Sequence, residues 1–178
     1  IVTEIAALLA YATIKSNDKI GLVLFSDHVE KYIPPKKGRA HVWNLIASIL
    51  NHEPKGSETN IEVAAQFLLN ITRRRATCFL LSDFWDENFV KALKVLNFRH
   101  DLVAMRILDQ NEKEFPSGAI VQFEDLESDE QLSIDLSRKQ KTVSINSYLK
   151  ARDAELHHLF KSSEIDFLDL LVGEDYVE

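Results

Sequence analysis

The sequence predicts a three-layer α/β domain built on a mostly parallel sheet. Short runs that are almost continuous in apolar residues alternate with segments of helical period along the 178 residues. Strands that are apolar on both faces are typical of a parallel sheet covered by helices on both sides. The order of the elements (helix, strand, strand, helix, helix, strand, helix, strand, helix, strand) is that of an α/β fold.

The first half of the chain is predicted to hold three helices and two strands. Apolar residues recur every three or four positions in residues 3–14, 42–50 and 61–69. Ile20–Phe25 is predicted to be a strand, and the more mixed residues 28–33 are predicted to pair with it as an antiparallel edge strand. The Pro34–Pro35 pair is expected to end that edge strand.

The second half continues the alternation and contains one excursion. Apolar strands are predicted at residues 76–82, 102–108 and 165–171, and helices at residues 89–96 and 145–161. Residues 109–142 contain turn residues around two alternating runs, at 119–123 and 131–136, which predicts a β-hairpin insertion. We expect one domain over residues 1–178 that carries this insertion.

Composition narrows the class of protein. Apolar residues make up 46% of the chain and charged residues 28%, as in soluble globular proteins, and no apolar stretch has the length of a membrane helix. A chain of this length has enough core without a metal or a disulfide. Cys78 is the only cysteine, which excludes an intramolecular disulfide and fits a reducing compartment, so we expect a cytoplasmic protein.

The charge balance argues against a nucleic-acid partner. There are 21 Lys and Arg against 28 Asp and Glu, a net charge of −7. The cations nevertheless cluster, and solvated loop charge is the favoured interpretation. The clusters are Lys36, Lys37 and Arg39; Arg73, Arg74 and Arg75; and Arg138, Lys139 and Lys141.

Two acidic residues follow the predicted strand at 76–82, where ligands bind in open α/β sheets. Asp83 sits where a carboxylate can hold a hard cation or can cap a helix, and the residues leave both open. Asp86 is favoured as the cap of a helix that begins near Glu87.

A second candidate lies in residues 56–61, before a strongly periodic helix. Thr59 and Glu62 have the spacing of a capping box, so a cap is favoured over a ligand for Thr59. No nucleophile, base and oxyanion hole can be assembled from the sequence, and Cys78 in its apolar run is interpreted as an unreactive thiol. We therefore expect no catalytic residues.

Taken in order, six segments resemble the bacterial family labelled "domain of unknown function 58", which has a Rossmann-like von Willebrand factor A fold. The segments are NDKIGLVLFSD (17–27), IPPKKGR (33–39), GSETNI (56–61), LLSDF (80–84), RILDQNE (106–112) and FEDLE (123–127).

This resemblance implies a non-enzymatic protein-interaction module, an adaptor or scaffold that works with a MoxR-type AAA+ ATPase. Such folds hold Mg²⁺ through an Asp-x-Ser-x-Ser motif after the first, central strand, together with a threonine and a later aspartate. Thr59 and Asp83 match those last two ligands. The resemblance places the partner-binding face at Ser26, Asp27, Ser57 and Asp86.

The chain departs from the family pattern at its start. It contains no Asp-x-Ser-x-Ser, and Ile1 falls inside the helix that would follow that motif, so the first central strand is absent from it. Mg²⁺ prefers six oxygen ligands. We expect Mg²⁺ in the full-length protein, weak or no Mg²⁺ binding by this chain, and self-association along the gap left by the strand.

Two other functions remain open. A Mg²⁺-dependent phosphoryl-transfer or phosphatase domain would use Asp83 and Asp86, because a metal held by carboxylates neutralises phosphoryl charge. The absence of a glycine-rich phosphate loop argues against it. A metal-free scaffold would use Thr59 and Asp83 only as helix caps.

Overall fold

A computed structural model describes residues 2–56, 58–86, 88–109, 120–124, 131–135 and 139–173. The chain divides into two compact units. Unit 1 comprises Ile1–Arg75 and Trp85–Leu96, and unit 2 comprises Ala76–Phe84 and Asn97–Glu178.

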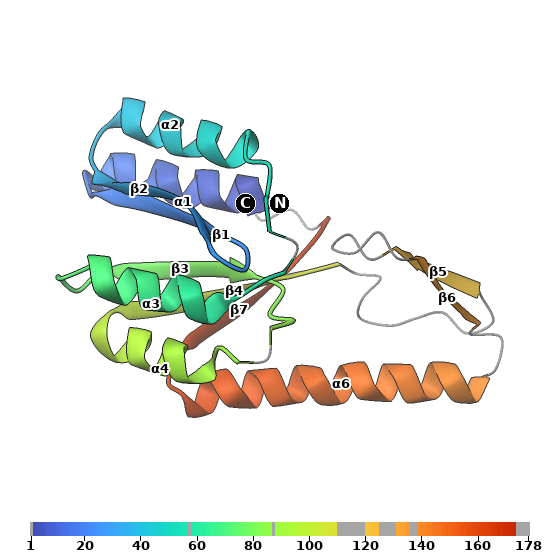
Figure 1. The fold of residues 1–178 in the computed structure, drawn as a ribbon. Coiled ribbons are helices and arrows are strands. Elements are labelled where there is room, and N and C mark those ends of the chain that lie inside the picture. The colour runs from blue at the N-terminus through green and yellow to red at the C-terminus, as the bar shows by residue number, and fades with distance from the viewer. Residues whose placement is uncertain are drawn as a thin grey trace. The chain divides into compact units, whose positions relative to one another are not determined.

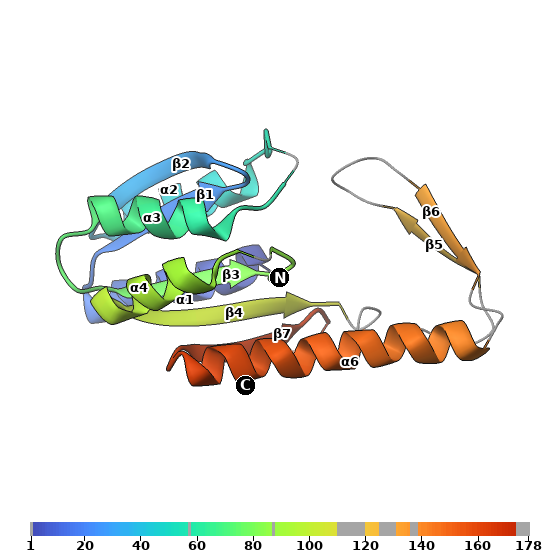
Figure 2. The ribbon, with the colours of Figure 1, turned by 60° about the horizontal axis from the view of Figure 1, so that its bottom comes forward.

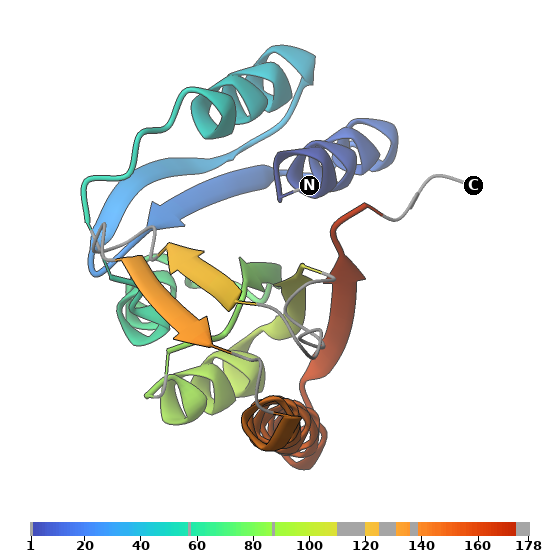
Figure 3. The ribbon, with the colours of Figure 1, turned by 90° about the vertical axis from the view of Figure 1, so that its right-hand side faces the viewer.

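Unit 1 is an antiparallel β-hairpin packed between helices (Figures 1 and 3). Helix α2 lies on one face of the hairpin beside α1, and α3 lies on the other face. Its elements are α1 (Val2–Ser16), β1 (Ile20–Phe25), β2 (Val29–Lys36), α2 (Arg39–Leu50), α3 (Ile61–Ile71) and the first part of α4 (Val90–Arg99).

Helix α3 shows how the periodic segments pack. Ile61, Ala64 and Ala65 recur on one side of the helix and are at most 4% exposed. Farther along, the Phe67 ring meets the Tyr32 ring of β2 edge-to-face, with 5.3 Å between centroids. The apolar stripe therefore fixes α3 along the length of the hairpin.

The edge strand β2 is longer than predicted. Pro34 and Pro35 were expected to end it, but it continues to Lys36. Proline is tolerated on an edge strand because the missing N–H need not take part in the ladder. Gly21 on β1 makes room, since a Cβ there would lie 2.8 Å from the Ile33 carbonyl oxygen and 3.1 Å from the Pro35 ring.

Unit 2 contains the parallel sheet (Figure 2). Its strands run in the order β3–β4–β7, and a separate antiparallel pair, β5–β6, confirms the predicted hairpin strands. Residues 116–118, which were predicted to form a turn before the first of these strands, lie outside the described residues. The elements are β3 (Thr77–Ser82), β4 (Asp101–Leu108), β5 (Ile120–Glu124), β6 (Gln131–Asp135), α6 (Lys139–Ser162) and β7 (Asp166–Leu171). The mixed α/β class is thus confirmed.

Helices α6 and α4 do not begin at the predicted residues. Helix α6 begins at Lys139, six positions before the predicted residue 145. The prediction missed the first turns because they lack apolar residues at three- or four-residue spacing. Helix α4 begins at Val90, after the predicted start near Glu87. Within the described ranges, we find no helix with both the length and the apolar character needed to cross a membrane.

Three phenylalanines join the elements of unit 2. Phe84, just after β3, and Phe160 on α6 are at most 1% exposed, and their rings meet edge-to-face at 5.2 Å. Phe160 stacks on Phe167 of β7 at 4.4 Å. The cluster therefore packs α6 onto the strand edge.

A buried arginine adds a polar connection between the same elements. Arg106 on β4 is 4% exposed and forms a bidentate pair with Asp169 on β7, with Nε at 2.7 Å and an Nη at 3.0 Å. The same guanidinium binds Asp153 on α6, and His157 lies 3.0 Å from Asp169. Partial burial raises the pKa of Asp169, but its hydrogen bonds and charge interaction with Arg106 outweigh burial and lower it.

We predict that Arg106→Ala lowers the free energy of unfolding by about 2 kcal/mol, because the half-buried Asp169 loses its charged hydrogen-bond donor, whereas Asp153, at 51% exposed, loses little. Urea denaturation followed by circular dichroism measures the change. Arg74→Ala, at an exposed position, is the control and should change stability by less than about 0.5 kcal/mol. Equal effects of the two substitutions would contradict a structural role for the pair.

Candidate functional site

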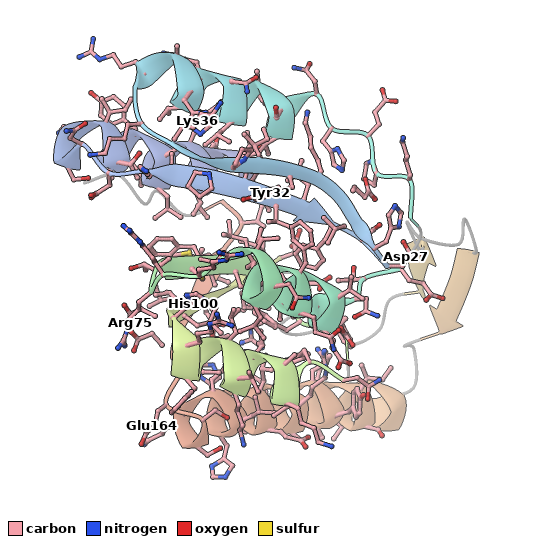
Figure 4. All side chains as sticks on the ribbon, turned by 60° about the vertical axis from the view of Figure 1, so that its left-hand side comes forward. Asp27, Tyr32, Lys36, Arg75, His100 and Glu164 are labelled. Atoms are coloured by element: carbon pink, nitrogen blue, oxygen red, sulfur yellow. The ribbon has the colours of Figure 1, made fainter. Side chains whose placement is uncertain are left out.

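The candidate site begins where β1 ends in unit 1. Ser26 is 7% exposed, and its carbonyl oxygen accepts a hydrogen bond of 2.8 Å from the Asn60 N–H. This bond brings the chain that enters α3 against the β1–β2 turn. Asp27 lies at this tip of the hairpin (Figure 4).

The cap of α3 differs from the one predicted. Asn60, in extended conformation, is the N-cap residue, and its Oδ1 accepts from the Val63 N–H at 3.0 Å. The predicted capping box of Thr59 and Glu62 is wrong by one residue, because the Ser26–Asn60 bond sets the point at which the chain enters the helix. Glu62 instead accepts from the Gln66 side chain at 2.8 Å, and Thr59 is exposed.

Asp86 also caps α3 and not the helix that follows it. Its Oδ2 accepts from the Ile61 N–H at 2.8 Å, and its Oδ1 accepts from the Asn88 N–H at 3.0 Å. A carboxylate at a helix N-terminus interacts favourably with the helix dipole. The prediction that Asp86 caps a helix starting near Glu87 is therefore corrected: the contact is long-range.

Glu30 on β2 organises the loop before α3, and no sequence pattern indicated this role. Its side chain is 2% exposed; Oε1 accepts from the Lys55 and Gly56 N–H groups at 3.1 and 3.3 Å, and Oε2 lies 2.7 Å from Nε2 of His52. The nearby Ser26 hydroxyl and the hydrogen bonds from the two amides outweigh the opposite effect of burial and lower the pKa of Glu30 to about 2.

Gly56 permits the loop to approach the hairpin turn. A Cβ at this position would lie 2.2 Å from Asp27 Oδ1 and 2.3 Å from Ser26 Oγ, closer than any side chain tolerates. The same Asp27 oxygen accepts from Ser26 Oγ at 3.0 Å and lies 2.6 Å from His28 Nδ1. These hydrogen bonds, that of His28 first, lower the pKa of Asp27.

We call this assembly the loop cluster. It consists of residues 26–28, Glu30, residues 52–56, residues 58–60 and Asp86. It brings together four of the residues singled out from the sequence, namely Ser26, Asp27, Thr59 and Asp86. Its buried anchor, Glu30, carried no local signal because the amides that it binds lie 25 and 26 residues further along the chain.

The other two predicted residues are Ser57 and Asp83. Ser57 is outside the described residues. Asp83 is exposed in unit 2 and precedes Phe84, which is buried with a positive φ of 57°. Hydrogen bonds from the Phe84 N–H to Ser82 Oγ, at 3.1 Å, and from Arg152 to the Phe84 carbonyl hold this strained residue in place. A joint site of Thr59 and Asp83 stays a prediction.

The donors of the loop cluster do not fit a magnesium site. Both oxygens of Asp86 accept from backbone amides, and Asp27 Oδ1 is engaged by Ser26 and His28. Among the described residues of the loop cluster, no three acidic or histidine side chains come close enough together to hold a metal ion, and the Thr59 hydroxyl supplies only one of the six oxygens that Mg²⁺ prefers. The phosphatase hypothesis uses Asp83, which is exposed, and Asp86, whose two oxygens accept from the Ile61 and Asn88 amides; it stays a prediction.

Among the residues of unit 2 that the structure describes, one group has the geometry of metal ligands. Ligand atoms of Asp153, His157 and Asp169 lie within 4.8 Å of one another. The guanidinium of Arg106 already pairs with both carboxylates and balances their charge, which leaves little reason for a metal ion there. We interpret the group as a structural ion-pair network.

Cys78 has the environment of an unreactive thiol. Burial, with a smaller contribution from the charge of Asp101, raises its pKa to about 11. The thiolate is the nucleophilic form, so Cys78 is almost fully protonated near neutral pH. This supports its interpretation as a packing residue.

Comparison with known proteins shows similarity to proteins of unestablished function. The family described as "Protein of unknown function DUF58" matches residues 1–155. Uncharacterized proteins of Mycobacterium bovis (Mb1516) and Mycobacterium tuberculosis (Rv1480) are each 26% identical over 126 residues, which is 69% of this chain and 40% of theirs. The chain thus spans less than half the length of these relatives.

A solved structure shares the fold. The crystal structure of the conserved hypothetical protein BatB from Bacteroides thetaiotaomicron superposes with a TM-score of 0.52 at 15% identity. The match covers 94% of this chain and 79% of that one.

We predict that Asp86→Ala lowers the free energy of unfolding by about 1 kcal/mol, because the first amide of α3 loses its acceptor. Asp86→Asn keeps one acceptor oxygen and should lose less. Urea denaturation compares the variants, with Asn60→Ala as a second cap deletion of similar size. A fully stable Asp86→Ala protein would contradict the long-range cap.

Glu30 should contribute to the acid stability of the fold. Its folded pKa, about 2, lies below the ordinary value of 4.5, so its stabilisation is complete above pH 4.5 and is lost as pH falls toward 2. Glu30→Gln should therefore be less stable at pH 7 and show a flatter decline over that window. Thermal unfolding across this range tests the prediction. Glu53→Gln, exposed in the same loop, should follow the wild-type profile.

Proposed function

The chain belongs to the DUF58 family, and from this premise we propose that it is a non-enzymatic protein-interaction domain of the von Willebrand factor A type. In this proposal it acts as an adaptor or scaffold for a MoxR-type AAA+ ATPase, as the family resemblance implies. Because the chain covers 40% of its curated relatives, the activity of the whole protein is part of the proposal.

The loop cluster is the observation that carries this proposal. Three separate stretches of unit 1 meet at the N-terminus of α3 through hydrogen bonds from Asn60 to Ser26 and from Ile61 to Asp86. Such bonds hold the backbone rigid, which reduces the entropy lost when a partner binds.

The exposed side chains of the loop cluster indicate the chemistry of the partner. The Asp27 side chain is 52% exposed, and Glu53, Glu58 and Thr59 are exposed as well. Lys55 is the only lysine or arginine among them. We therefore expect a partner surface with positive charge and with hydrogen-bond donors for these oxygens.

A metal ion is expected to play only a small part in partner binding by this chain. The Thr59 hydroxyl and the Asp83 carboxylate are two oxygen donors, and the nearby carboxylates Asp27 and Asp86 are engaged in hydrogen bonds. We expect this chain alone to bind Mg²⁺ weakly or not at all, and its partner contact to persist in a chelator.

The proposal predicts that the purified chain binds a MoxR-type ATPase from the same genome. Replacing Asp27 with Asn and Thr59 with Val together should weaken binding about tenfold, because both remove exposed polar contacts at the centre of the face. Biolayer interferometry with EDTA present measures the affinity. The exposed residues Lys91 and Lys94 on α4 supply the matched control, a double alanine variant.

Two results would contradict this function. One is equal affinity of the ATPase for the wild type and the Asp27/Thr59 variant, with circular dichroism showing that both are folded. The other is hydrolysis of a generic phosphate ester that disappears in Asp83→Ala, which would favour the phosphatase hypothesis.

A further inference from the structure

The end of unit 1 opposite the loop cluster has a local excess of positive charge. Its exposed cations come from the α1–β1 connection, the β2–α2 connection and the segment after α3, with one acid, Asp18, among them. We call this set the basic end: Lys15, Lys19, Lys36, Lys37, Arg39, Arg73 and Arg74. The chain as a whole has a net charge of −7, so the basic end reverses the overall sign.

Contacts around Ile20 bring most of this set together. Ile20 pairs in register with Lys36, and the Ile20 carbonyl oxygen lies 2.8 Å from Nε2 of His41 in the first turn of α2. Lys19 precedes Ile20, and Arg39 begins α2. Three segments of the chain therefore place their cations around one strand end.

Helix α3 carries the remaining cations to the same end. It starts at the loop cluster and its 11 residues span about 16 Å, close to the length of the six-residue strand β1 beside it. Arg73 and Arg74 follow its last turn. Figure 4 shows Arg75, the next residue, on the same side of the molecule as Lys36 and away from Asp27.

The cations of the basic end are not all explained by a contribution to the stability of the fold. Lys15 at the end of α1 suits the helix dipole, but Lys37 and Arg39 flank the N-terminus of α2, where cations are unfavourable. That helix has no acid in its first turn. The ion pairs found among the described residues involve none of these seven cations.

Exposed aromatic residues accompany the cations. Trp43 is 66% exposed and lies one helical turn beyond Arg39 on the same face of α2. Tyr11 is 55% exposed, and Lys15 Nζ lies 5.8 Å from its ring centroid. Trp and Tyr beside Lys and Arg are typical of surfaces that contact the headgroup region of a membrane.

We propose that the basic end binds anionic lipid headgroups and docks unit 1 onto a membrane surface. The cations come from several separate segments of one end, as a broad anionic surface requires, and the aromatic side chains can enter the interface. The net charge of −7 argues against a nucleic-acid partner. Docking in this orientation leaves the loop cluster pointing away from the lipid.

Vesicle sedimentation with the full chain tests the proposal. The chain should bind vesicles of equal parts phosphatidylcholine and phosphatidylglycerol, should not bind phosphatidylcholine alone, and should dissociate as salt is raised. Lys36→Glu with Lys37→Glu should weaken binding about thirtyfold. Lys91→Glu with Lys94→Glu changes the net charge equally on α4 and should leave binding near the wild-type value.

The fluorescence of Trp43 gives a second measurement, which reports on the contact of the aromatic side chain with the lipid. In a Trp85→Phe protein, Trp43 emission should shift to the blue when anionic vesicles are added. Absence of the shift, absence of wild-type binding, or equal weakening by the two lysine pairs would overturn the proposal. Equal or stronger binding of duplex DNA or polyglutamate at the same salt would overturn the lipid assignment. None of these results depends on binding to the ATPase.

Discussion

The backbone amides at the start of α3 are the constraint on which the organisation of unit 1 depends. A helix leaves its first N–H groups without intrahelical partners, so acceptors must come from elsewhere. Here the Asn60 side chain, and Asp86 from a distant segment, supply them, and the amide of Asn60 itself binds the Ser26 carbonyl. Satisfying these donors draws three parts of the chain together.

The charge distribution of unit 1 follows from the same architecture. Each of β1, β2, α2 and α3 runs the length of the unit, so connections alternate between its two ends. Acids and hydroxyls occupy the connections at the loop cluster, and lysines and arginines occupy those at the basic end. One small unit can therefore present two faces of opposite charge, which suits contacts with two different partners.

Unit 2 depends on a different kind of interaction. Arg106 is buried against the carboxylates of Asp153 and Asp169, beside the aromatic cluster of Phe84, Phe160 and Phe167. A buried charge is tolerated only when it is paired and hydrogen-bonded, and here the pairs also set the position of α6 on the sheet. The strained backbone at Phe84 is held by the same packing, next to the exposed Asp83.

The local sequence pattern determined which segments form helices and strands, because the apolar period of a helix and the apolar run of a strand depend only on neighbouring residues. Strand β1 occupies Ile20–Phe25 as predicted, and the α/β class follows from such elements. Helix-cap and strand-end patterns selected Thr59 and Asp86, and the family resemblance selected Ser26 and Asp27. Only tertiary structure decided that Asn60 caps α3, that Asp86 caps it from a distance and that Glu30 anchors the loop. The bonds of Asp86 to Ile61 and of Glu30 to Gly56 join residues more than twenty positions apart, and the Asn60 cap is set by the equally long-range bond from Asn60 to Ser26. No local pattern encodes such contacts.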